Sequence, residues 1–493
     1  QNTGSHTVEV ELPADRLPLD NRRTAVVEAV DEAEVLLVTT SERKNLEDDA
    51  FYLSTALNPG ATAATGLRPR IEQPRALTTL ELNSFDSIWL LDVPPLDARA
   101  IRPLEDYARN GGGVVFFVGP KTDYKSINEF LFFNLSVAMS SLLSPLTFTR
   151  GPSLKNRFML APLTNTQSFE DGKLSDEEFR WLTMRAEGGF GLTMTCASHV
   201  QDIGKGFPGQ LGVYSDDHLE GLKRLSSEIN ANGSVSICQL HHAGMRSPEE
   251  LIGQRPVCPS NNEKFGARGL SIDEVEILRD DFIRAAIRSE EAGFDGVELH
   301  GAHGYILAQF LSAEINRRDD QYGQTLSNRS RLLYEIIDGI REKCRKDFIV
   351  GVRLSPERFG LKLGEITLLA EELMTSNKID FLDMSLWDVF KEPEEEEFKG
   401  KKLISYFTEL KRGNTRLGVA GAIKTPQDAE KTLAEGVDWI MLGRAAMLNH
   451  NFPKLYEANS SFLPAEIPVT EDYLKSEGLS EKFIQYIEKW GFT

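Results

Sequence analysis

The sequence predicts an α/β protein in which a (β/α)₈ TIM barrel, residues 150–493, follows a small N-terminal α/β segment. Three observations predict the barrel. Eight short apolar runs follow Arg150, glycines recur where helices should end before strands, and polar residues gather directly after several of the runs. A doubly wound sheet is the alternative for the same alternation of strands and helices.

The eight apolar runs have the length of strands and are mostly separated by amphipathic helical stretches. Several are continuously apolar, as expected of parallel strands that are covered on both faces. In chain order they are Arg157–Ala161, Leu192–Thr195, Val235–Leu240, Gly296–Leu299, Phe348–Leu354, Phe381–Met384, Leu417–Ala420 and Trp439–Leu442.

A glycine-containing pattern recurs before three of these runs. It reads Ala186-Glu-Gly-Gly-Phe-Gly-Leu, then Glu291-Ala-Gly-Phe-Asp-Gly-Val, then Ala434-Glu-Gly-Val-Asp-Trp-Ile. Each copy places a glycine where a helix should end, and glycine suits the left-handed residue that terminates many helices. The repeated helix–glycine–strand unit favours the barrel over the doubly wound sheet.

The first part of the chain has its own alternation of strands and helices. Glu34–Thr39, Ser87–Asp92 and Val114–Val118 read as buried strands, and a helical stretch near Leu104–Arg109 precedes the third. This segment resembles the glutamine-amidotransferase-like modules that accompany von Willebrand-type domains in some bacterial membrane proteins. That chemistry needs a cysteine nucleophile, and the chain has no cysteine before Cys196. We therefore expect residues 1–123 to be a partial, non-catalytic domain and residues 124–149 to be a linker and barrel lead-in.

The ends of the first part suggest how it arose. Gln1 reads as the edge of a fragment, and Met139 as the natural start of the barrel protein. On this hypothesis the upstream part joined by genomic accident or gene-assembly error. Mass spectrometry of the native protein tests it, because an intact product that extends well before Met139 contradicts it.

Composition excludes several function classes. A formal charge of −20 and a pI near 5.0 argue against nucleic acid or an anionic membrane as partner. No apolar stretch is long enough to span a membrane. The four cysteines form no CxxC pair, so neither a zinc ribbon nor an iron–sulfur cluster is indicated. Their scattered placement favours free thiols in a reducing cytoplasm, with one disulfide as the alternative.

Polar residues and glycines follow the predicted strands at the positions where barrel enzymes carry their active sites. These residues come from six of the eight strands, which is harder to attribute to chance than any one motif. In chain order they are Thr164, Gln239, His241, His300, His303, Arg353, Gly421, Gly443 and Arg444. The sequence therefore predicts one site at the carboxyl end of the barrel.

Several segments of the second part together resemble the Old Yellow Enzyme family. They are Asn156-Arg-Phe-Met-Leu-Ala-Pro-Leu-Thr164, Val297-Glu-Leu-His-Gly-Ala-His-Gly-Tyr305, Gln309-Phe-Leu-Ser, Asn316-Arg-Arg-Asp-Asp-Gln-Tyr-Gly, Asn328-Arg-Ser-Arg, Val352-Arg-Leu-Ser-Pro356 and Leu442-Gly-Arg444. The resemblance covers about residues 139–493. It implies an FMN-dependent oxidoreductase that uses NADPH or NADH to reduce the activated C=C bond of a small enone or enoate. A homo-oligomer is compatible with it.

The resemblance also implies catalytic roles for three residues. His300 and His303 would donate hydrogen bonds to the substrate carbonyl, on which negative charge develops during hydride addition. Tyr305 would protonate the alpha carbon as general acid. Metal ligation by the two histidines is the alternative, but neither a carboxylate nor a third histidine stands in register with them. We expect no metal.

By the same resemblance a further set of residues binds FMN. Thr164 would contact the flavin carbonyl, Gln239 the pyrimidine edge, and Arg353 the N1 region, while Ala197 lines the ring. Gly421, Gly443 and Arg444 would hold the phosphate, since glycines allow close backbone approach and arginine offers a fork of donors. The remaining residues implied to bind FMN are Ala161, Pro162, Leu163 and His300. Each polar residue taken singly has a structural alternative, such as a turn residue for Thr164 or an ion pair for Arg353.

Two other functions compete with this hypothesis. One is a different flavin barrel that acts on amines or quinones. The other is a fused interaction protein with a vestigial barrel, against which the intact set of His300, His303 and Tyr305 speaks.

Overall fold

The computed structural model divides the chain into two compact units, residues 1–140 and 141–493. It describes residues 4–11, 22–29, 32–40, 49–59, 65–96, 98–109, 112–117, 119 and 142–493. Met139 and most of the 124–149 segment therefore lie outside the described residues, whereas 142–149 belong to the second unit. Each unit is described by itself.

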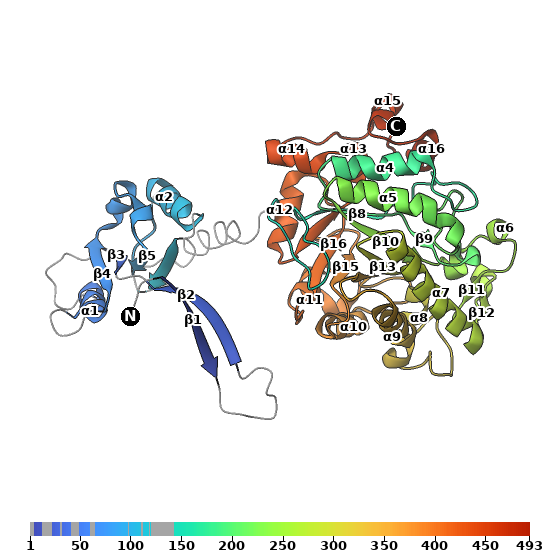
Figure 1. The fold of residues 1–493 in the computed structure, drawn as a ribbon, viewed down its shortest axis with the longest axis horizontal. Coiled ribbons are helices and arrows are strands. Elements are labelled where there is room, and N and C mark those ends of the chain that lie inside the picture. Colours follow the sequence, from blue (N-terminus) through green and yellow to red (C-terminus); the bar gives the residue numbers. More distant parts are fainter. Residues whose placement is uncertain are drawn as a thin grey trace. The chain divides into compact units, whose positions relative to one another are not determined.

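The second unit is a closed barrel of eight parallel strands, which confirms the predicted (β/α)₈ fold (Figure 1). Neighbouring strands of the ring follow one another in the chain, and the last strand closes the ring by pairing with the first. The strands are β7 (Phe158–Leu160), β8 (Leu192–Met194), β10 (Val235–His241), β13 (Gly296–Gly301), β14 (Ile349–Leu354), β15 (Phe381–Ser385), β16 (Arg416–Ala420) and β17 (Trp439–Leu442). All eight lie where the sequence predicted strands.

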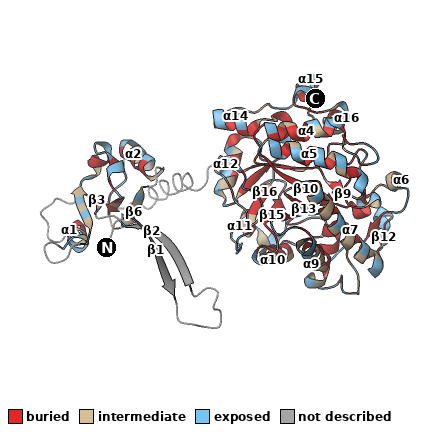
Figure 2. Cartoon of the chain, viewed as in Figure 1, coloured by how far each residue is buried: buried red, intermediate tan, exposed pale blue. Residues whose placement is uncertain are grey.

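Helices cover the outside of this barrel, with their exposed faces toward solvent and the buried strands inside (Figure 2). In chain order the main ones are α4 (Asp176–Glu187), α5 (Leu219–Ala231), α7 (Ile272–Glu291), α9 (Leu326–Lys343), α10 (Leu363–Thr375), α12 (Pro426–Ala434) and α14 (Phe452–Ala458). Several begin at a side-chain cap, such as Ser271 at α7, whose hydroxyl accepts a hydrogen bond from the Glu274 N–H. The predicted glycines Gly189, Gly293 and Gly436 all have positive φ between a helix and the next strand.

Alternate residues of each strand form two separate cores. Phe158 and Leu160 of β7 pack outward against the helices, whereas Met159 points into the barrel. The interior cluster continues with Met194, Ile237 and other apolar residues at the amino ends of the strands. Phe148, from the lead-in, packs against this cluster and lies 5.4 Å from the Trp439 ring centroid. Apolar side chains thus fill the amino end of the barrel, and the carboxyl end is left to polar ones.

The first unit contains a small parallel sheet in the order β4–β3–β5–β6. The strands are β3 (Ala33–Thr39), β4 (Leu67–Glu72), β5 (Ser87–Leu91) and β6 (Gly113–Phe117), with helices α1 (Asp49–Leu57) and α2 (Ala98–Arg109). Three of these strands were predicted, although Val118 lies outside the described residues. The prediction missed β4, a charged edge strand that contains Pro69, and the antiparallel pair β1 (Gly4–Glu11) and β2 (Arg22–Ala29).

Candidate active site

The carboxyl ends of the barrel strands surround a cavity of about 320 Å³. Its lining contains many residues that the sequence predicted to bind a cofactor, namely Ala161, Pro162, Leu163, Arg353, Gly421, Gly443 and Arg444, together with His303. Sequence reasoning missed the other lining residues, Ser385, Trp387, Ala420, Ala422, Ile423, Lys424 and Met441. The volume lies within the range of small-molecule sites in proteins.

Two histidines and a tyrosine lie together beside this cavity. His300 Nε2 is 3.1 Å from His303 Nδ1, and the Tyr305 ring centroid is 5.1 Å from that of His300. His303 has a φ of +57°, and its backbone N–H donates to Ser355 Oγ at 2.9 Å. This left-handed residue turns the chain so that the His303 imidazole faces that of His300, which lies at the carboxyl end of β13.

Burial keeps the site's imidazoles neutral. It lowers the pKa of His303 to about 3, with the positive charges of Arg353 and Arg246 as further causes. Burial also lowers the pKa of His300 well below its usual range, followed by the effects of His303 and His241. At neutral pH both rings therefore act as neutral groups, each with one N–H donor and one nitrogen acceptor.

A third imidazole, His241 of β10, completes the group. Its ring centroid lies 4.4 Å from that of Tyr305 and 5.3 Å from that of His300. The sequence placed His241 at a strand end but gave it no role. Its partner Gln210 is distant in the chain, and the Gln210 amide lies 3.1 Å from His241 Nδ1.

Gln210 fixes the proton position on His241. The amide oxygen accepts from the Gly206 N–H at 2.7 Å, so the amide nitrogen faces the Ala197 carbonyl at 2.5 Å and His241 Nδ1. His241 Nδ1 is then an acceptor, and Nε2 carries the hydrogen. That Nε2 is buried and has no hydrogen-bond partner among the described residues.

Other predicted residues lie around the cavity rather than in its lining. Gln239 is buried inside the barrel, where its Nε2 donates to Glu298 Oε2 at 2.5 Å. Thr164 is adjacent to the Tyr486 hydroxyl. Ala197 contributes its carbonyl to Gln210. Arg353, by contrast, does line the cavity, and its Nε donates to Ser385 Oγ at 2.7 Å.

Comparison with known proteins identifies this arrangement. The family model described as the NADH:flavin oxidoreductase / NADH oxidase family matches residues 141–460. The chain belongs to this family. It is thus an NAD(P)H-dependent flavin oxidoreductase of the Old Yellow Enzyme type, with FMN as cofactor, as the sequence predicted. Residues 1–123 lie outside the match, and their resemblance to an amidotransferase-like module stays a prediction.

Similar curated proteins and solved structures agree with the family. The chain is 34% identical over 322 residues to a probable NADH-dependent flavin oxidoreductase of Bacillus subtilis, covering 63% of this chain and 86% of that protein. It is 32% identical to an NADH:fumarate oxidoreductase of Klebsiella pneumoniae, covering 62% of this chain but only 35% of that protein. An Old Yellow Enzyme homologue from Zymomonas mobilis superposes with a TM-score of 0.59 at 26% identity, covering 69% of this chain and 99% of that one.

The cavity has the chemistry that FMN needs. Arg353, Lys424 and Arg444 place cationic side chains in its lining, which suits an anionic phosphate. Gly421 allows the chain after β16 to pass close to Val389, because a Cβ at this position would lie 3.0 Å from the Val389 backbone nitrogen. Ala161, Pro162, Leu163 and Met441 supply apolar surface for a ring system.

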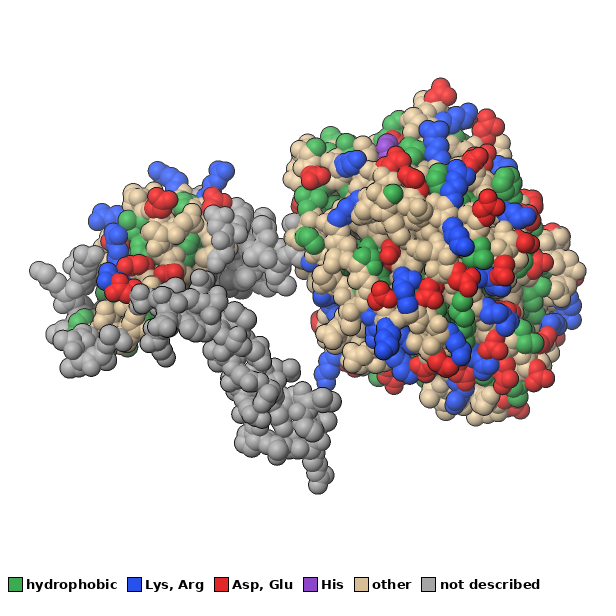
Figure 3. Space-filling view, viewed as in Figure 1, with side chains coloured by type: hydrophobic (Ala, Val, Ile, Leu, Met, Phe, Trp, Pro, Cys, Tyr) green, Lys and Arg blue, Asp and Glu red, His purple; other side chains and the backbone are tan. Residues whose placement is uncertain are grey.

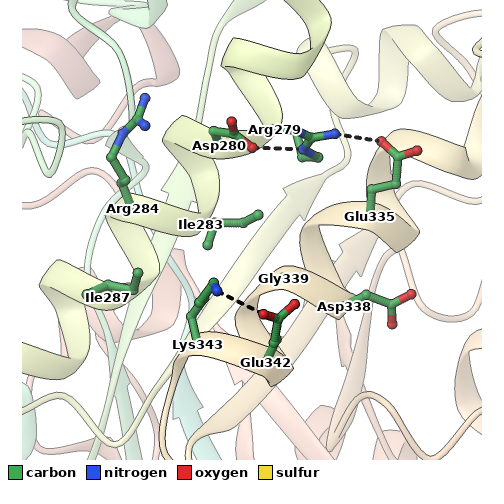
Figure 4. A pocket seen from close by; sticks show the side chains of 10 residues that line it. All are labelled: Arg279, Asp280, Ile283, Arg284, Ile287, Glu335, Asp338, Gly339, Glu342 and Lys343. Carbon is green, nitrogen blue, oxygen red and sulfur yellow. Dashed lines mark hydrogen bonds and ion pairs between the residues drawn. The ribbon is translucent and has the colours of Figure 1, made fainter.

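A larger groove of about 600 Å³ lies on the outside of the barrel, between α7 and α9 (Figure 4). Several of its charges are paired with one another: Arg279 contacts Asp280 and Glu335, and Lys343 contacts Glu342. Positive and negative side chains are interspersed over the visible face of the barrel (Figure 3). The groove lies between outer helices, whereas the strand-end cavity lies where barrel enzymes carry their active sites, so we place the active site at the latter.

No group of three or more histidine, cysteine, aspartate or glutamate side chains in the described part of the chain is arranged to hold a metal ion. None of the described helices combines the length and the apolar character needed to cross a membrane.

Proposed function

We propose that this enzyme reduces the activated C=C bond of α,β-unsaturated carbonyl compounds at the expense of NADH or NADPH. The observation that carries the proposal is the pair of neutral imidazoles, His300 Nε2 and His303 Nδ1, which lie 3.1 Å apart beside Tyr305.

The two imidazoles can receive a carbonyl oxygen between them. Without substrate, one nitrogen donates its hydrogen to the other. An oxygen that enters beside both atoms replaces that bond when His300 carries its hydrogen on Nε2 and His303 on Nδ1. Two N–H groups then point at one oxygen, and they stabilise the negative charge that develops on it as the alkene is reduced.

Tyr305 would supply the proton. Hydride addition to the beta carbon leaves charge on the carbonyl oxygen and the alpha carbon, and transfer of the Tyr305 hydroxyl proton to the alpha carbon completes the saturated product. Arg246 supports this geometry, because its guanidinium lies 4.9 Å from the Tyr305 ring centroid and donates to the His303 carbonyl.

FMN, when bound, supplies the hydride that it has taken from the nicotinamide. The residues that would hold it are Arg353, Gly421, Gly443 and Arg444 in the cavity lining, with Lys424 as an additional cation. We further propose that Gln239 and Thr164 contact the flavin ring and that Ala197 leaves room for it.

Separate measurement of the two half-reactions tests the role of Tyr305. In stopped-flow experiments with 2-cyclohexenone, Tyr305→Phe should slow alkene reduction by about 10²–10⁴-fold while reduction of the flavin by NAD(P)H stays within a few-fold. Tyr334→Phe is a matched control, since its hydroxyl lies on α9 next to Glu372. Equal slowing of both half-reactions by Tyr305→Phe would contradict the proposed proton donor.

A further inference from the structure

Two carboxyl groups are buried at the centre of the barrel, beneath the predicted flavin residues. Glu298 belongs to β13 and Asp383 to β15, and both side chains have 0% exposure. The strand between them, β14, carries Arg353, which is paired in register with Asp383 and with His300. Neither carboxyl group takes part in the proposed proton transfer.

Each carboxyl group has one satisfied and one unsatisfied oxygen. Glu298 Oε2 accepts from Gln239 Nε2 at 2.5 Å, and Asp383 Oδ1 accepts from Trp439 Nε1 at 3.1 Å. Glu298 Oε1 and Asp383 Oδ2 are buried, and neither has a hydrogen-bond donor among the described residues. Buried acceptors without a donor are rare in folded proteins, because the lost solvation of the oxygen is not replaced by a hydrogen bond.

A glycine on the neighbouring strand leaves space for the Asp383 carboxyl group. Gly418 of β16 lies opposite Asp383, and a Cβ there would sit 2.0 Å from both Asp383 Oδ1 and Trp439 Nε1. A side chain at this position would displace the aspartate. Because residue 418 is a glycine, there is room for the hydrogen bond between Trp439 and Asp383.

A single proton accounts for both unsatisfied oxygens. Burial raises the pKa of both carboxyl groups, and the adjacent charge of Glu298 raises that of Asp383 further, while Arg353 opposes the shift in each. Two unprotonated carboxylates would repel each other in a medium of low polarity. One O–H between Glu298 Oε1 and Asp383 Oδ2 removes that repulsion and supplies the missing donor.

We propose that Glu298 and Asp383 share one proton, and that the resulting singly charged pair positions Gln239 and neutralises Arg353 at the flavin. This extends the proposed function and rests on its placement of FMN. Glu298 holds one amide hydrogen of Gln239, which leaves the second hydrogen and the amide oxygen for the pyrimidine edge. The pair balances the charge of Arg353, which would otherwise act on the flavin without a counter-charge.

Amide substitutions in the FMN-loaded full-length chain distinguish a carboxyl pair with one negative charge from a pair with two. In Glu298→Gln or Asp383→Asn, an amide N–H takes the place of the shared proton and one negative charge remains. Each single variant should therefore leave the ratio of reduced to oxidised flavin at fixed potential within threefold of the parent. Glu298→Gln combined with Asp383→Asn removes the charge, and Arg353 should then shift that ratio at least tenfold toward reduced flavin.

Glu178→Gln is the matched control, because Glu178 is equally buried and hydrogen-bonded but lies on α4. It should leave the flavin potential unchanged. Single variants that each shift the ratio by about half of the double-variant effect would mean two charges and overturn the proposal. A double variant with the parent's potential would also overturn it.

An infrared measurement on the FMN-free chain tests the shared proton without any flavin or alkene. The parent-minus-variant difference spectrum should show the carbonyl band of a protonated carboxylic acid for both single variants. Absence of that band from either difference would overturn the proposal even if the double variant does not fold. Because no enone is involved, an enzyme inactive toward enones would contradict the proposed function and leave this result unaffected.

Discussion

The two ends of the barrel interior are built from the same strands but carry opposite chemistry. On β14, Ile349 belongs to the apolar cluster, and Arg353, four residues later, lines the cavity. On β15, Phe381 packs in the same cluster, and Ser385 receives the Arg353 hydrogen bond. Four residues along one strand, or two side chains further along the same face, therefore separate residues that stabilise the barrel from residues that line the ligand cavity. Substitutions at the apolar end should therefore change the free energy of unfolding, and substitutions at the polar end should change ligand binding and turnover.

The largest effect should come from the apolar end. Phe381 is fully buried and lies 5.3 Å from the Trp439 ring centroid, so Phe381→Ala should lower the free energy of unfolding by about 3–5 kcal/mol. FMN affinity of the folded variant should stay within a few-fold of the parent. Urea unfolding and flavin fluorescence measure the two quantities. Loss of FMN binding in a fully folded Phe381→Ala variant would contradict the claim that the apolar end affects stability alone.

At the polar end the opposite outcome is expected. His303→Ala removes one donor to the substrate oxygen and should reduce enone turnover by about 10²–10³-fold. His303→Asn is the matched control, since asparagine keeps an N–H donor and tolerates the φ of +57°. It should retain most of the turnover and show a melting temperature close to that of the parent. Similar losses in both variants would argue that His303 acts through the backbone rather than as a donor.

The polar end also makes the barrel sensitive to acid. Burial lowers the pKa of His242 to about 3, with the neighbouring His199 as a further cause, against an ordinary value of 6.5. Between about pH 3 and 6.5 the unfolded chain therefore binds a proton on His242 that the folded chain does not bind. The free energy of unfolding therefore decreases as the pH falls below about 6.5. From pH 6.5 to 4.5 this residue alone should cost about 2–3 kcal/mol.

The pH dependence of unfolding checks this. His242→Gln should reduce the fall in the free energy of unfolding between pH 6.5 and 4.5 by that amount, whatever its stability at pH 7. The comparison within one pH series removes the contributions of other groups, including Glu298 and Asp383. An unchanged slope in His242→Gln would mean that His242 is already protonated in the folded protein or gains room to accept a proton.

The sequence predicted the strands because parallel barrel strands are covered on both faces and read as apolar runs. It predicted much of the cavity lining because those residues directly follow strands. It missed Ser385, Trp387 and Lys424, which lie at or after β15 and β16 without a motif of their own. It also missed the pairing of His241 with Gln210 and of Glu298 with Asp383, because each joins positions that only the closed barrel brings together.

The central claim, that the polar end reduces activated alkenes, is tested most directly by product analysis. The full-length chain with FMN should oxidise NADH or NADPH under anaerobic conditions when 2-cyclohexenone is added, and form one cyclohexanone per nicotinamide consumed. Nicotinamide oxidation that does not depend on cyclohexenone, with no cyclohexanone formed, would contradict the account.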